Sequence, residues 1–215
     1  DLMKQYDYVG LKTFIKQRNI MDFNLLFNVF PKKIYPFDYQ TYFNSPERFI
    51  MVTSNCLTGE AVYLEEKQDE KRVLDICVAT CSLPLLCPIA YVDGIPMVDG
   101  GVCDALPIRK SEADGNSRNV IVLTRNKGYR KPVKQQKLPG FVFRKYPELR
   151  RELMLRYQRY NETIEYIEQL EADGKALVIR PIRDVVVDRI ERDVDKLTSF
   201  YEEGYACAKA AFEKK

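Results

Sequence analysis

The sequence predicts an α/β fold in which helices cover a sheet, and three observations support this prediction. Hydrophobic residues make up 46% of the 215 residues, which is enough to bury a sizeable core. Strand-like apolar runs alternate with helix-like segments through the first 125 residues, as they do in α/β folds. The remainder of the chain adds two long segments of helical periodicity. We therefore expect one large domain with an appended extension.

The first part of the chain carries the weakest pattern. Apolar residues fit a helix within residues 4–19, and residues 21–30 predict a helical or irregular stretch before Pro31. Nothing before residue 48 supplies the strand and glycine turn with which a doubly wound sheet usually begins.

A hairpin is predicted next, because strand-like apolar runs at residues 48–55 and 61–64 flank the turn sequence Leu-Thr-Gly-Glu. Residues 69–81 then predict a helix with an acidic first turn and one apolar face. Pro84 ends that helix.

The strongest turn signal is Asp93-Gly94, which predicts a second hairpin between strands at residues 89–92 and 95–98. Asp99 therefore lies where the second strand ends. The first of these strands closes an uncharged run of 17 residues at 76–92, which approaches the length of a membrane span. Two prolines within the run would break a membrane helix, so we expect it to be buried core.

Further elements follow in the C-terminal part. They are a buried strand at residues 119–124, a helix from Pro147 to Gly174, a strand at 176–179, a short strand at 185–187, and an amphipathic helix at 190–212. We expect the apolar face of the first of these helices to dock on the core.

Charge is distributed unevenly, although the net charge is only +3. No acidic residue occurs between Asn116 and Pro147, and we call residues 118–145 the cationic segment. Its basic residues are Arg118, Arg125, Lys127, Arg130, Lys131, Lys134, Lys137, Arg144 and Lys145. The segment is either a solvated loop or a site for anionic membrane or an acidic protein. Nucleic acid is disfavoured, because the basic residues follow no helix or zinc-finger spacing.

Six cysteines lie mostly within apolar runs, which predicts buried free thiols and a reducing, cytoplasmic compartment. Cys77 and Cys81 have a metal-like spacing, but no second close pair and no histidine completes four ligands, so we expect no metal site. The absence of histidine also excludes a Ser-His-Asp triad. Proton transfer must therefore fall to a carboxylate, lysine, tyrosine or cysteine.

Asp99 is the best candidate base, because it ends an apolar strand and precedes Gly100 and Gly101, which allow a close approach by backbone or substrate. A serine within hydrogen-bond reach would lose its proton to Asp99 as it attacks an ester. The alternative is that Asp-Gly-Gly only closes the strand with turn-favouring residues. A phosphatase with Asp99 as nucleophile would want a second carboxylate where Gly101 stands.

Several ordered pieces of the chain resemble the patatin-like phospholipases. Residues 48–64 look like the family's central hairpin, and Ala79-Thr80-Cys81-Ser82-Leu83-Pro84 is similar to its Ala-Ser-x-x-x-Pro segment. Val98-Asp99-Gly100-Gly101, followed by Asp104-Ala105-Leu106-Pro107, resembles its Asp-Gly-Gly/Ala motif. Residues 176–181, 195–197 and 201–205 look like the C-terminal extension of bacterial members.

This resemblance implies a three-layer α/β sandwich that hydrolyses lipid acyl esters without a metal or other cofactor. It implies that Asp99 is the base of a Ser-Asp dyad and that Gly100 and Gly101 form its supporting turn. Residues 1–140 would be the C-terminal part of the hydrolase domain, and residues 141–215 a helix-strand-helix extension packed on it.

Two motifs of the family are absent from the sequence, namely the Gly-x-Ser-x-Gly nucleophile elbow and the glycine-rich oxyanion loop. Ser117 follows Gly115, but Asn119 stands where the second glycine should be; Ser82 precedes Leu83-Pro84 as a helix-end residue. We therefore expect the first strand-turn-helix units and the nucleophile to be missing from this chain, which alone should be inactive.

Overall fold

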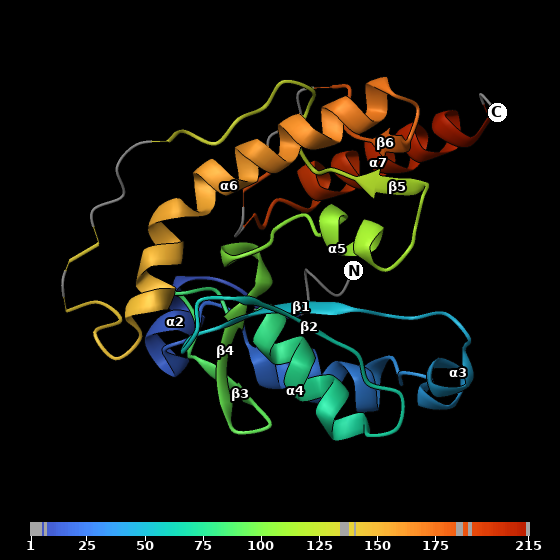
Figure 1. Ribbon diagram of the computed structural model, residues 1–215. Helices are drawn as coiled ribbons and strands as arrows, with labels where there is room; N and C mark the ends of the chain where they lie inside the picture. Colours follow the sequence, from blue (N-terminus) through green and yellow to red (C-terminus); the bar gives the residue numbers. More distant parts are fainter. Residues whose placement is uncertain are drawn as a thin grey trace. The chain divides into compact units, whose positions relative to one another are not determined.

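Two antiparallel hairpins form the larger sheet of the protein. The computed structural model describes residues 6, 8–133, 138–139, 141–183, 187–188 and 191–213. The strands are β1 (Met51–Asn55), β2 (Ala61–Leu64), β3 (Ala90–Val92) and β4 (Ile95–Asp99). They lie in the order β2-β1-β4-β3, and every neighbouring pair is antiparallel (Figure 1). Tight turns connect each hairpin, and such short connections permit only antiparallel pairing.

Helix α4 (Glu70–Thr80) covers one face of this sheet (Figure 1). Its N-cap is Asp69, whose carboxylate accepts from two backbone N–H groups of the first turn. Ile76 and Ala79 are fully buried against Met51 and Met97. The uncharged run at residues 76–92 is thus divided among α4, a loop and β3, as expected of core. No helix among the described residues is long and apolar enough to cross a membrane.

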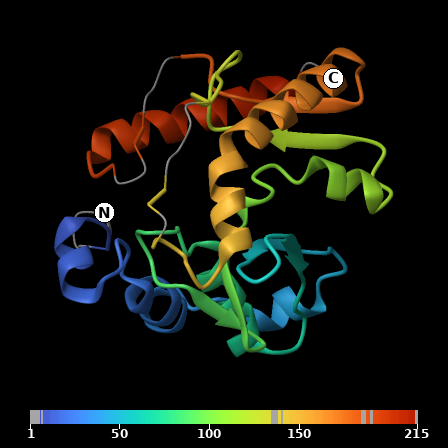
Figure 2. The same ribbon diagram turned by 60° about the vertical axis from the view of Figure 1, so that its left-hand side comes forward.

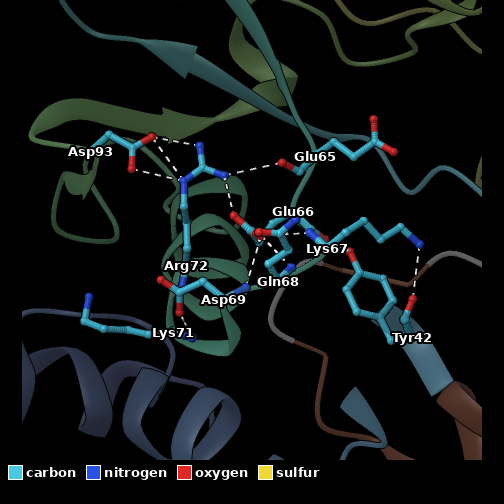
Figure 3. Close-up of polar contacts among 9 residues, drawn as sticks. All are labelled: Tyr42, Glu65, Glu66, Lys67, Gln68, Asp69, Lys71, Arg72 and Asp93. Carbon is cyan, nitrogen blue, oxygen red and sulfur yellow. Dashed lines mark hydrogen bonds and ion pairs between the residues drawn. The ribbon is translucent and has the colours of Figure 1, made fainter. Parts of the chain in front are cut away.

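Arg72 of α4 ties the β3–β4 turn to the end of β2 (Figure 3). Its Nε donates to Asp93 Oδ1 at 3.0 Å, and its Nη2 donates to Asp93 Oδ2 at 2.8 Å. Its Nη1 donates to Glu66 Oε2 at 2.9 Å. Glu66 Oε1 in turn accepts from the backbone N–H groups of residues 67–69, so one guanidinium orders both chain segments. We call this set of contacts the Arg72 clamp.

In the described residues before the sheet lie three short helical segments: α2 (Leu11–Gln17), the π-helix η1 (Leu25–Ile34) and α3 (Tyr39–Asn44). The wide turn of η1 is evident from the Tyr35 N–H, which donates to Phe30 O at 2.8 Å, five residues back. Pro31 lies inside η1. The sequence did not predict α3, because six residues are too few to show helical periodicity.

The C-terminal part contains a parallel strand pair, β5 (Asn119–Val122) and β6 (Ala176–Ile179), which begins with Asn119 opposite Ala176. The accompanying helices are α5 (Ile108–Ala113), α6 (Pro147–Ala172) and α7 (Val194–Glu213). Figure 1 shows β6 between α6 and α7, and Figure 2 shows β5 above α5. The buried residues Ile108, Ile167 and Leu170 form a core against these strands.

The chain divides into two compact units, each with its own core. The hairpin unit comprises Tyr6–Ala105 and Lys134–Arg159, and the C-terminal unit includes Leu106–Val133 and Tyr160–Lys215. Helix α6 contributes to both, because Leu149 and Leu153 belong to a core of the hairpin unit and Ile167 and Leu170 to that of the C-terminal unit.

The α/β class is confirmed, as are the predicted hairpins and the helices at α4 and α6. The last helix begins at Val194 rather than at residue 190, because Asp193 Oδ1 accepts from the N–H groups of Asp195 and Lys196 as a cap. Of the strand predicted at residues 185–187, the first two residues lie outside the described residues. The short helix α5 was not predicted.

Candidate functional site

Asp99 lies where β4 ends, as the sequence predicted, and its backbone is held on both sides. It pairs with Thr53 of β1, and its N–H donates to Ser82 O at 3.0 Å. The short 3-10 helix η2 (Gly100–Val102) begins directly after it. Asp99 Oδ1 accepts from the Gly101 N–H at 2.7 Å, so the carboxylate caps the turn that follows it. The side chain is half-buried.

Gly100 lies against the backbone of β1. A Cβ atom at this position would lie 2.3 Å from Val52 O, far inside van der Waals contact. Thr80 Oγ1 also donates to Val52 O at 2.7 Å, so this carbonyl is held in place by α4. The glycine is therefore required by the close approach of two backbone segments.

Ser54 braces the turn from β1 and was missed by the sequence reasoning. Its fully buried hydroxyl donates to Asp99 O at 2.9 Å and accepts from the Cys103 N–H at 3.2 Å. The only sign of this role in the sequence was a polar residue within an apolar strand. Such a pattern does not show which group the buried hydroxyl will bond to.

Two cysteine thiols lie close enough to Asp99 to respond to its charge. Burial, with a further contribution from the Asp99 carboxylate, raises the pKa of Cys81 to about 11. The pKa of Cys87 is also raised, chiefly by burial. These thiols stay protonated at neutral pH, and a thiol is a poor nucleophile compared with its thiolate. Neither cysteine is therefore a good candidate nucleophile.

A second carboxylate, Asp104, lies on the same turn but has a different partner. Tyr63 Oη donates to Asp104 Oδ2 at 2.7 Å. Burial and this hydrogen bond raise the pKa of Tyr63 well above its ordinary range, so the phenol remains a donor. Asp104 thus fastens the turn to β2.

The N-terminal half of α6 packs against this turn. Leu149 and Leu153 form a buried core with Val98 and Val102, the residues that flank the Asp-Gly-Gly triplet. The apolar face predicted for α6 therefore docks on the core as expected, and it does so at the candidate site.

Neither serine considered from the sequence is placed as a nucleophile. Ser82 is buried, and its Oγ donates to Val78 O at 2.8 Å at the end of α4, the predicted helix-end role. Ser117 is exposed in the connection between α5 and β5, without the strand-turn-helix setting of a nucleophile elbow.

The described part of the cationic segment is partly engaged within the chain. Arg130 Nη2 pairs with Glu168 at 2.6 Å, and Lys131 Nζ lies 3.8 Å from the centre of the Tyr160 ring. Lys134 and Lys137 lie outside the described residues. The interpretation of this segment as a membrane or protein site is therefore no better supported than the hydrolase interpretation.

No group of three or more histidine, cysteine, aspartate or glutamate side chains among the described residues is arranged to hold a metal ion. Cys77, one of the pair with metal-like spacing, instead packs beside the core, with its Sγ 3.7 Å from Met51 Sδ. All six cysteines carry free thiols.

Two family models match the chain. One, described as patatin-like phospholipase, matches residues 2–110, and the other, described as a domain of unknown function (DUF6363), matches residues 146–214. A search of curated proteins found no match. The first match spans half of the chain and contains Asp99, Gly100 and Gly101.

Proposed function

This chain belongs to the patatin-like phospholipase family, and from that premise we propose that it carries the general base of a lipid acyl ester hydrolase. The base is Asp99, the substrate is a lipid or other acyl ester, and the nucleophile is a serine outside these 215 residues. The observation that carries the proposal is the braced Asp-Gly-Gly turn, which holds one carboxylate at the end of β4.

In the proposed reaction the serine oxygen bonds to the ester carbonyl carbon, and the serine proton passes to the Asp99 carboxylate. The proton then moves to the leaving alkoxide as the ester bond breaks, which leaves an acyl-enzyme for water to hydrolyse. An aspartate that acts as base must hold its position, because effective proton transfer needs hydrogen-bond geometry. Ser54, Gly100 and Gly101 support this position as positioning residues.

The first test is the Asp99→Asn substitution in the protein purified with its natural termini. We expect ester hydrolysis to fall by about 10² to 10⁴, the usual contribution of a general base. The matched control is Asp104→Asn, which changes a carboxylate on the same turn and still leaves an oxygen to accept from Tyr63. Equal losses in both variants, or no loss in Asp99→Asn, would contradict the proposed role of Asp99.

A further inference from the structure

A pocket of about 500 Å³ lies in the C-terminal unit, and its lining shares no residue with the Asp99 site. Four parts of the chain contribute to its lining: the end of α6, the loop after β5, the end of β6 with its following loop, and one face of α7. Its lining includes Val178, Ile179, Pro181, Ile182, Ala210 and Ala211, so most of the wall is apolar. This volume is typical of small-molecule sites.

The pocket is open because α7 presents short side chains to it. Cys207, Ala210 and Ala211 are spaced three and four residues apart, which places them on one face of the helix. The pocket also lies beyond the carboxyl ends of the parallel strands β5 and β6, where ligands of open α/β sheets usually bind.

The loop that forms one wall is held from two sides. Asn126 Nδ2 donates to Ile182 O at 3.3 Å and to Arg183 O at 3.1 Å. Glu203 of α7 accepts from the backbone N–H groups of the same two residues, each at 2.9 Å. A wall ordered in this way loses little conformational entropy when a ligand binds.

The charges on the lining favour an anion. Lys127 and Arg180 line the pocket together with one carboxylate, Glu171, which pairs with Arg180. Among the described residues, the lining therefore carries one net positive charge. Lys127 is exposed, so that a ligand can reach it. An apolar wall next to a net positive charge fits a molecule with an apolar tail and one negative head group.

We propose that this pocket binds a fatty-acid-type anion, with the carboxylate near Lys127 and Arg180 and the alkyl chain along Ala210 and Ala211. The inference is independent of the proposed hydrolase function, since it concerns different residues and is tested by binding alone. A failure of either proposal therefore leaves the other unaffected.

The test is calorimetric titration of the protein with dodecanoate below its micelle concentration, beside dodecanol and dodecyltrimethylammonium. We expect dodecanoate to bind at least about tenfold more tightly than either, and the preference to shrink as salt rises. Equal affinity for dodecanoate and dodecanol, or preference for the cationic amphiphile, would overturn the proposal.

Substitutions locate the site. Ala211→Phe fills the pocket and should weaken dodecanoate binding by at least about tenfold. The matched control is Ala206→Phe, which changes an exposed alanine of the same helix outside the lining and should leave binding intact. Lys127→Gln, at an exposed position, should weaken dodecanoate by about threefold and leave dodecanol unchanged. Unchanged dodecanoate affinity in both Ala211→Phe and Lys127→Gln would overturn the assignment to this pocket.

Discussion

At residue 100 a single methyl group would decide whether the turn after Asp99 can form. Gly100 approaches Val52 O so closely that any side chain must displace β1 or η2. The same two segments position Asp99, through its pairing with Thr53 and its hydrogen bond from Gly101. The glycine therefore acts on the candidate base through backbone geometry.

Gly100→Ala should destabilise the protein by about 3 kcal/mol, because overpacking forces the backbone to move. The measurement is urea unfolding followed by circular dichroism. Gly204→Ala is the matched control, because Gly204 lies in α7 and an added Cβ atom there would meet nothing within 4 Å. This change should stabilise the protein by about 0.5–1 kcal/mol. A Gly100→Ala variant as stable as the wild type would contradict the close approach.

The contacts of Glu203 in the C-terminal unit should weaken in acid. Hydrogen bonds from the Arg183 backbone and side chain, and from the Ile182 N–H, lower the pKa of Glu203 from 4.5 to about 2. The folded-state pKa lies below the unfolded value, so the stabilisation is fully present above about pH 4.5 and is lost as pH falls toward 2.

Glu203→Gln should therefore lower the free energy of unfolding at neutral pH, and its difference from the wild type should shrink between pH 4.5 and 2. Thermal melts across this range measure the difference. Glu202→Gln, which changes the exposed neighbouring carboxylate, should show no such pH dependence. A difference that stays constant down to pH 2 would argue against a lowered pKa of Glu203.

At the scale of elements, the β3–β4 hairpin depends on a contact with a residue outside it, Arg72 of α4. The Arg72 clamp holds the Asp93 turn to α4 and to the end of β2. The hairpin delivers Asp99 at its other end, so the clamp helps to set where the candidate base lies. The Arg72 side chain is 27% exposed, which leaves its ion pairs only partly screened by solvent.

Arg72→Ala should cost about 2 kcal/mol, since it removes charged hydrogen bonds and leaves Glu66 without this partner. Lys71→Ala is the comparison one residue earlier. The Lys71 side chain is 81% exposed and pairs with Asp75 at the next turn, so its loss should cost less than about 0.5 kcal/mol of stability. Urea unfolding of both variants measures the contrast. Similar small losses in the two variants would show that the clamp contributes little.

At the scale of the whole molecule, the proposed dyad is incomplete within this sequence. The site holds a positioned carboxylate, while no serine of the chain occurs in a Gly-x-Ser-x-Gly motif. Serine-directed fluorophosphonate labelling with intact-mass measurement distinguishes a nucleophile outside the chain from one within it.

We expect the protein from its natural source to be heavier than 25.1 kDa and to take one adduct, and this 215-residue chain to take none. The physical reason is that an unactivated serine hydroxyl reacts poorly with such reagents. A labelled 215-residue chain would place the nucleophile within it, and an unlabelled natural protein of the same mass would contradict the hydrolase proposal. The boundary at residue 140 between hydrolase domain and extension stays a prediction.

Much of the local structure could be predicted from the sequence because periodicity and turn chemistry are local. The strands β1 to β4, the Asp93-Gly94 turn and the buried face of α6 follow from spacing alone. The short helices α3 and α5 could not be predicted, since six residues hold less than two turns of pattern. The position of Asp99 at a strand end was predictable, and its bracing by Ser54 was not.

Local sequence decides that Asp99 ends a strand before two glycines and that the chain belongs with the patatin-like phospholipases. Tertiary structure alone decides that β1 pairs with β4, that Val52 excludes a side chain at Gly100, and that α7 leaves a pocket beside Arg180. The physical reason is distance along the chain. Contacts between residues some 45 positions apart depend on the packing of whole elements, and no spacing rule within one element encodes them.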